Sequence, residues 1–82
     1  MFYSQKSNFT SEPFVKHSDK RMWLLASGVG AVRVERMDQS GNYKLYPEMT
    51  FTAPCAQVIE LPPGQVRIVV GAGPLDVEVT MV

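Results

Sequence analysis

Two glycines near the C-terminus, in the stretch VVGAGPLD, have the spacing that a dinucleotide-binding loop uses. Such a loop needs Gly-x-Gly-x-x-Gly after a strand, and then a helix whose N-terminus meets the pyrophosphate. Gly71 and Gly73 are present, but Asp76 occupies the third position and an alternating apolar segment follows instead of a helix. The stretch GVGAVR at 28–33 fails in the same way, with Arg33 in the third position. Both stretches therefore indicate turns, in which glycine supplies a positive φ angle.

The other reactive side chains do not combine into a catalytic set. His17 is the single histidine and stands in a charged segment, and Cys55 has no sequence relation to it. A nucleophilic cysteine needs a base that lowers its pKa, so we expect Cys55 to be a small buried residue. Asp76 and Glu78 share one face of a strand, where ion-paired surface carboxylates are expected rather than the acid pair of a glycosidase. We predict a non-enzymatic protein with no catalytic, cofactor-binding or metal-binding residues.

Composition narrows the class of protein further. The chain has 82 residues, 45% of them hydrophobic, and its eight Lys and Arg balance its eight Asp and Glu. This length fits one small domain, and a neutral chain lacks the basic surface that binds nucleic acid. One cysteine and one histidine cannot complete a four-ligand zinc site, and no apolar run approaches the roughly 18–20 residues of a membrane span. We expect no cofactor and neither nucleic acid nor membrane as partner, and a small core that gains from association.

The elements that must position any site are short strands. From residue 21 onward, segments rich in β-branched residues are separated by turn signals, and none keeps a helical period. The segments are RMWLLAS, AVRVERM, NYKLY, EMTFTA, QVIEL, QVRIVV and LDVEVTMV. They predict an all-β fold, a small antiparallel β-sandwich or jelly-roll-like barrel of about six to seven strands with an extended N-terminal arm. The expected organisation is an arm over residues 1–20 and a β-sandwich domain over residues 21–82.

Loop lengths in the C-terminal half predict how these strands pair. Four-residue loops at 62–65 and 71–74 would form two hairpins and place Arg67 between Glu60 and Glu78. A shift of one residue would set apolar side chains against charged ones, so the pattern resists it. In a jelly roll, however, some consecutive strands lie in opposite sheets, and the PPG turn could cross between layers.

The DQSG stretch predicts one more hairpin in the middle of the chain. A loop at 38–41 would pair Val34 with Leu45 and Glu35 with Lys44. Apolar would then oppose apolar on one face, and opposite charges would meet on the other.

The first 20 residues show no sustained period, but they contain isolated aromatic side chains. Four aromatics fall within fourteen residues: Phe2, Tyr3, Phe9 and Phe14. Disordered tails are poor in aromatic residues. We therefore expect an extended arm that docks these side chains on a neighbouring subunit, with a frayed terminus as the alternative.

The remaining aromatic residues could form a platform that stacks on sugars. Trp23 lies in an apolar run, so we expect it in the core. Tyr46 falls on the expected outer face together with Arg33, which indicates a contact surface there. Exposure of Trp23 would favour a carbohydrate- or receptor-binding module instead.

Residues 55–82, which include AQVIELPPGQVRIVVGAGPLDVEVTMV, resemble the C-terminal strands of small β-sandwich proteins from tailed-phage particles. In those proteins an apolar strand ends in a Pro/Gly turn and a valine-rich hairpin closes the chain. LPPG followed by alternating valines also occurs in carbohydrate-binding sandwich domains. No functional residue of the family is carried over by this resemblance.

The resemblance implies a structural protein of the bacteriophage virion, assembled in the host cytoplasm, that decorates or cements the capsid. Its expected partners are the major capsid protein and itself, as a homo-oligomer such as a homotrimer. The expected partner-binding residues are Phe2, Tyr3, Phe9, Phe14 and Tyr46. The alternative is a carbohydrate- or receptor-binding β-sandwich module.

Overall fold

Nine β-strands make up the chain in a computed structural model, which describes residues 1–82 except the side chains of residues 45–48. The strands are β1 (Phe2–Lys6), β2 (Phe9–Thr10), β3 (Phe14–Lys16), β4 (Met22–Gly28), β5 (Ala31–Met37), β6 (Tyr43–Thr52), β7 (Cys55–Ile59), β8 (Gly64–Val70) and β9 (Leu75–Met81). Six of them come from residues 21–82, within the expected six to seven, and three come from the N-terminal segment. The all-β prediction is confirmed.

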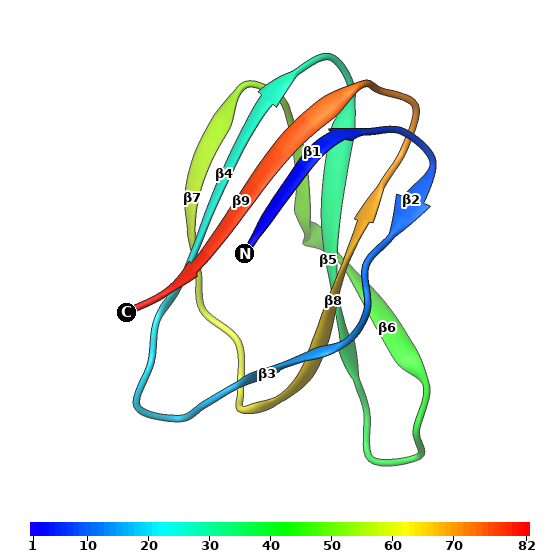
Figure 1. Cartoon of the computed structure of the whole chain (residues 1–82). Coiled ribbons are helices and arrows are strands. Elements are labelled where there is room, and N and C mark those ends of the chain that lie inside the picture. Colours follow the sequence, from blue (N-terminus) through cyan, green and yellow to red (C-terminus); the bar gives the residue numbers. More distant parts are fainter.

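The strands form two antiparallel sheets that face one another (Figure 1). One sheet has the order β1-β9-β4-β7, and the other has the order β2-β8-β5-β6, with β3 also paired to β8. If β2 and β3 are taken as one interrupted strand, this is the strand order of a jelly roll. The sandwich expected from the sequence is therefore present, with the topology in which consecutive strands change sheets.

The core lies between the sheets and is built by two-residue alternation. In β4, Met22, Leu24 and Ala26 point inward and are buried, whereas the residues between them are exposed. The same period holds in β8 and β9. Aliphatic side chains from both sheets fill the interior: Met22, Leu24, Ala26, Val32, Val34, Ile59, Val66, Ile68, Val70, Leu75, Val77 and Val79. The apolar face that the sequence assigns to each of the last two strands is the buried one.

The two hairpins expected in the C-terminal half are not formed. The loop at 71–74 has the expected bounds, but β8 and β9 belong to opposite sheets, as do β7 and β8. Arg67 therefore does not lie between Glu60 and Glu78, because it stands opposite Glu35 of β5. The alternation of apolar and polar residues determines which side chains face the interior of the sandwich. This assignment is the same whether a strand pairs with its neighbour in the chain or lies in the opposite sheet, so alternation does not determine the pairing.

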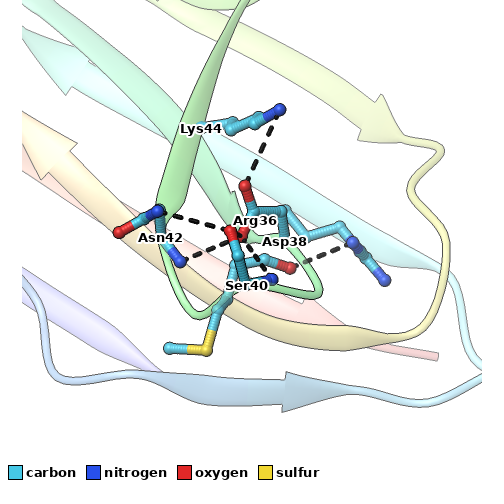
Figure 2. Close-up of polar contacts among 6 residues, drawn as sticks. Arg36, Asp38, Ser40, Asn42 and Lys44 are labelled. Atoms are coloured by element: carbon cyan, nitrogen blue, oxygen red, sulfur yellow. Dashed lines mark hydrogen bonds and ion pairs between the residues drawn. The ribbon is translucent and has the colours of Figure 1, made fainter.

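The hairpin of β5 and β6 is present, with a loop one residue longer than expected. Its loop spans residues 38–42, so Lys44 stands opposite Arg36 rather than Glu35. Oδ1 of Asp38 accepts hydrogen bonds from the backbone N–H of Ser40 at 3.0 Å and of Asn42 at 2.9 Å (Figure 2). The hydrogen bonds from Asn42 and Ser40 hold the pKa of the Asp38 carboxyl below its ordinary value. This Asx-type turn closes the wider loop and shifts the register.

The N-terminal segment is extended, as expected, but it belongs to the sandwich of its own molecule. β1 lies along β9 at an edge of one sheet, and β2 and β3 lie along β8 at an edge of the other (Figure 1). The rings of Tyr3 and Phe9 pack with centroids 5.6 Å apart. The buried Lys16 donates from Nζ to the carbonyl oxygens of His17 and Lys20, which closes the loop into β4. The segment thus covers two sheet edges that would otherwise be open.

The two glycine stretches are turns of different kinds. Gly28 and Gly30 have positive φ angles of 108° and 118°, as the sequence predicts. Gly71 and Gly73 do not have positive φ angles, so that expectation is wrong for them. At Gly73 a side chain would instead collide with the carbonyl oxygen of Lys6. Both loops lie at crossings between the sheets, where backbones approach closely.

Candidate binding surface

The outward side of β4 exposes large apolar side chains. Trp23 and Leu25 alternate with the buried residues of this strand and are 46% and 51% exposed. The expectation that Trp23 lies in the core is therefore wrong. β4 is apolar on both faces, but a strand in a two-layer sandwich can bury only one of them.

Neighbouring strands extend this apolar surface on both sides. On β7, Val58 stands opposite Trp23 and Ala56 opposite Leu25, and both are exposed. Glu78 of β9 stands opposite Leu25 of β4 on one side and opposite Phe2 of β1 on the other. We call this surface the β4 face, and its members are Phe2, Trp23, Leu25, Ala56, Val58, Glu78, Thr80 and Val82. A contiguous exposed apolar patch of this kind often marks an interaction site.

The charge on the β4 face is acidic. Glu78 is exposed between Phe2 and Leu25, and it forms no ion pair with any residue whose side chain is described. Asp76, on the same strand, accepts a hydrogen bond at 2.7 Å from the backbone N–H of Gln5, which fastens β1 to β9. Glu78 is therefore the carboxylate on this face that remains available to a partner.

The expected partner-binding residues have different positions in the structure. Phe2 is 64% exposed on the β4 face. Tyr3, Phe9 and Phe14 pack against the core of their own molecule, so they are not exposed anchors for a neighbouring subunit. The side chain of Tyr46 lies outside the described residues. The structure brings Phe2 together with Trp23 and Leu25, which are new to the candidate site.

The reactive residues considered in the sequence are not brought together. His17 is exposed in the loop between β3 and β4, and Cys55 begins β7 with its side chain packed against the core. Burial raises the pKa of the Cys55 thiol, which disfavours the nucleophilic thiolate. Among residues with described side chains, no group of three or more His, Cys, Asp or Glu could hold a metal ion.

The outer side of the other sheet carries a compact ion-pair cluster. The Glu35 side chain is 8% exposed, and its two oxygens accept hydrogen bonds from Nε of Arg33 at 3.1 Å and Nε of Arg67 at 2.7 Å. The guanidinium carbon of Arg67 lies 4.0 Å from the centroid of the Tyr43 ring. A carboxylate engaged through both oxygens is suited to holding strands together rather than to transferring protons.

Replacing Glu35 with glutamine should lower the free energy of unfolding by roughly 1.5–3 kcal/mol, the typical worth of hydrogen bonds to charged groups. The substitution keeps the shape of the side chain but leaves Arg33 and Arg67 without their counter-charge. Glu78→Gln is the matched control, because Glu78 is exposed and has no ion pair among described side chains. Urea denaturation of both variants measures the difference, and equal losses would contradict a structural role for Glu35.

Comparison with protein-family models, curated proteins and solved structures finds no significant match to this chain. Across the described residues, no helix is long and apolar enough to cross a membrane.

The apolar run around Trp23 is a sequence signal for the β4 face, and the prediction that Trp23 lies in the core did not take into account that this run covers both faces of its strand. RMWLLAS contains five consecutive apolar residues, whereas AVRVERM and LDVEVTMV alternate between apolar and polar residues over most of their length. A strand that is apolar on both faces is buried on both sides only in a three-layer fold or under a partner. In a two-layer sandwich the same pattern predicts one exposed apolar face.

Proposed function

We propose that this chain is a non-enzymatic structural protein of a bacteriophage virion, which decorates or cements the capsid through the β4 face. The observation that carries the proposal is the exposed apolar surface centred on Trp23 and Leu25. The resemblance of residues 55–82 to sandwich proteins of tailed-phage particles supports the same class. Jelly rolls occur in viral capsid proteins, although the fold alone does not define a function.

The chemistry of the β4 face specifies what its partner must offer. Burying Trp23 and Leu25 needs an apolar patch on a coat subunit, because apolar area removed from water supplies the driving force. Burying Glu78 without a counter-charge is costly, so the coat surface should place a Lys or Arg against it. The proposed occupant is therefore an apolar coat-protein surface with a basic residue near its centre.

Cementing follows from binding the assembled state alone. A ligand that binds one state shifts the equilibrium toward that state by mass action. If the apolar and basic groups are adjacent only in the assembled shell, each bound copy of the chain opposes disassembly. This mechanism requires binding alone and no catalytic residues.

A carbohydrate-binding module is the second candidate, and the exposure of Trp23 is the observation that favours it. A sugar platform stacks on aromatic faces, flanked by polar groups that bond to hydroxyls. On the β4 face the partners opposite Trp23 are Val58 and Thr80, and Leu25 lies between Ala56 and Glu78. A mainly aliphatic surround favours a protein partner over a sugar.

Co-sedimentation with the particles of the virus that encodes the chain tests the proposal. The chain should bind assembled particles and not unassembled coat protein. Leu25→Lys should weaken binding at least about tenfold, since a buried unpaired charge costs several kcal/mol. Val15→Lys is the matched control, because Val15 is a half-exposed aliphatic strand residue on the other sheet.

The outcomes separate the two candidates. Equal loss of binding by Leu25→Lys and Val15→Lys would exclude the β4 face as the binding surface. Failure of the wild-type chain to bind particles, together with a change in Trp23 fluorescence on adding oligosaccharide, would favour the sugar-binding module.

A further inference from the structure

We propose that β7 is a self-association edge, at which a second copy of this chain pairs antiparallel to β7 about a twofold axis at Gln57. β7 ends its sheet, and among the described residues its strand partner is β4. Alternate residues of a strand direct their N–H and C=O groups to opposite sides, so about half of these groups in β7 point away from β4. These groups are a template for another strand.

The other sheet edges are protected by recognisable devices. β1 is interrupted by a register shift between Tyr3 and Lys6, and Gln5 has a positive φ angle. β2 and β3 share the edge beside β8 and are separated from one another. β6 carries Lys44, and its sequence contains a proline and a glutamate. Bulges, interruptions, charges and prolines are the usual means of preventing edge pairing.

β7 has none of these devices. Its five residues, CAQVI, contain no charge and no proline, and its burial is greatest at the inward-facing Ile59. Prolines and a glutamate stand just outside it, in AP before the strand and ELPP after it. The unprotected length is therefore five residues, and an antiparallel copy of the same strand matches that length.

Pairing about Gln57 is self-complementary. In this register Gln57 opposes its own copy, and Ala56 opposes Val58 of the second copy on the outward side. Cys55 opposes Ile59 of the second copy on the inward side. Apolar residues meet apolar residues on each face, and no like charges face one another within the five residues.

The pairing would join two β4 faces into one surface. Val58 and Ala56 stand directly beside Trp23 and Leu25, so the apolar surface of each copy runs up to the shared edge. Two linked faces would bind an assembled shell with greater avidity than one. This consequence rests on the proposed function, whereas the pairing itself does not.

Charge reversal at the twofold axis tests the pairing. By analytical ultracentrifugation, the wild-type chain should approach twice the 9.1 kDa mass of one copy as its concentration rises. Gln57→Lys and Gln57→Glu should each weaken self-association at least about tenfold, because like charges would oppose one another across the axis. An equimolar mixture of the two variants should restore the dimer, since opposite charges then meet.

Gln65→Lys is the matched control, because Gln65 is an exposed glutamine on β8, away from the β7 edge, and should leave the dimer intact. A wild-type chain that remains at 9.1 kDa up to about 1 mM would overturn the pairing, as would a trimer or a mixture that stays monomeric. Circular dichroism confirms that each variant is folded. A wild-type chain that binds particles but does not dimerise overturns this inference alone. A wild-type dimer that binds no particle overturns the proposed function alone.

Discussion

Replacing Gly30 with alanine should lower the free energy of unfolding by roughly 2–5 kcal/mol, a large part of the stability of a small domain. Gly30 lies in the turn between β4 and β5 with a φ angle of 118°, where an L-residue is strained by roughly 1–2 kcal/mol. A Cβ atom there would also collide with the carbonyl oxygen of Ala72 in the β8–β9 loop. Displacing that backbone adds an overpacking cost of roughly 1–3 kcal/mol.

The collision matters because two crossings between the sheets meet at this point. Backbone hydrogen bonds run from the N–H of Val29 to the carbonyl of Pro74 and from the N–H of Gly71 to the carbonyl of Ala31, each at 3.1 Å. Neither loop can move away from a new methyl group without losing one of these bonds. The substitution therefore weakens the hydrogen-bonded contact between the two loops that connect the sheets.

Gly41→Ala separates the backbone strain from the collision. Gly41 also has a positive φ angle, 91°, but no atom lies within 4 Å of the position its Cβ would take. Alanine at 41 should therefore cost only the strain, roughly 1–2 kcal/mol. Urea denaturation followed by far-ultraviolet circular dichroism compares the variants, and equal losses would show that the Ala72 loop yields freely.

Much of the fold is predictable from the residues, because burial depends on a period of two. Val66, Ile68 and Val70 alternate with positions that are exposed or only partly buried, and the structure buries this set. A slip of one residue would exchange the whole set with the opposite face, so the pattern is strongly specified. Strand positions and the apolar face of each strand follow from this period alone.

Strand pairing does not follow from the same period. Arg67 has the same outward direction whether β8 pairs with β9 or with β5, so alternation cannot choose between Glu78 and Glu35 as its neighbour. The choice is made by loops that cross between sheets, at residues 60–63 and 71–74. A short loop with proline and glycine can form either a hairpin or a crossing between sheets. Which of the two forms depends on the three-dimensional arrangement of the sheets.

The candidate site was only partly predictable for a related reason. An aromatic residue in an apolar run is usually buried, and Trp23 departs from this rule because its strand has two apolar faces and one covering layer. Conversely, Tyr3 and Phe9 stand in a polar segment but are partly buried, because the segment pairs with β9 and β8. Local composition indicates whether a side chain favours burial. The number of sheet layers and the pairing of the segment decide whether the fold buries it.

Replacing Leu24 with alanine should lower the free energy of unfolding by roughly 2–5 kcal/mol, whereas the same change at Leu25 should cost less than about 1 kcal/mol. The two leucines are neighbours on β4 and differ in the side they face. Leu24 is fully buried between the sheets, so truncation leaves a cavity. Leu25 is 51% exposed on the β4 face, where truncation leaves no cavity to fill.

Thermal unfolding followed by circular dichroism measures both changes. For a domain of this size a loss of about 3 kcal/mol lowers Tm by roughly 12–24 °C, so Leu24→Ala should unfold well below the wild-type chain. Similar losses from the two variants would mean that the β4 face is covered in the isolated chain, and an exposed docking surface would then be excluded. Loss of particle binding by Leu25→Ala at unchanged Tm would separate the two roles of one strand, because its inward residues stabilise the sandwich while its outward residues bind the partner.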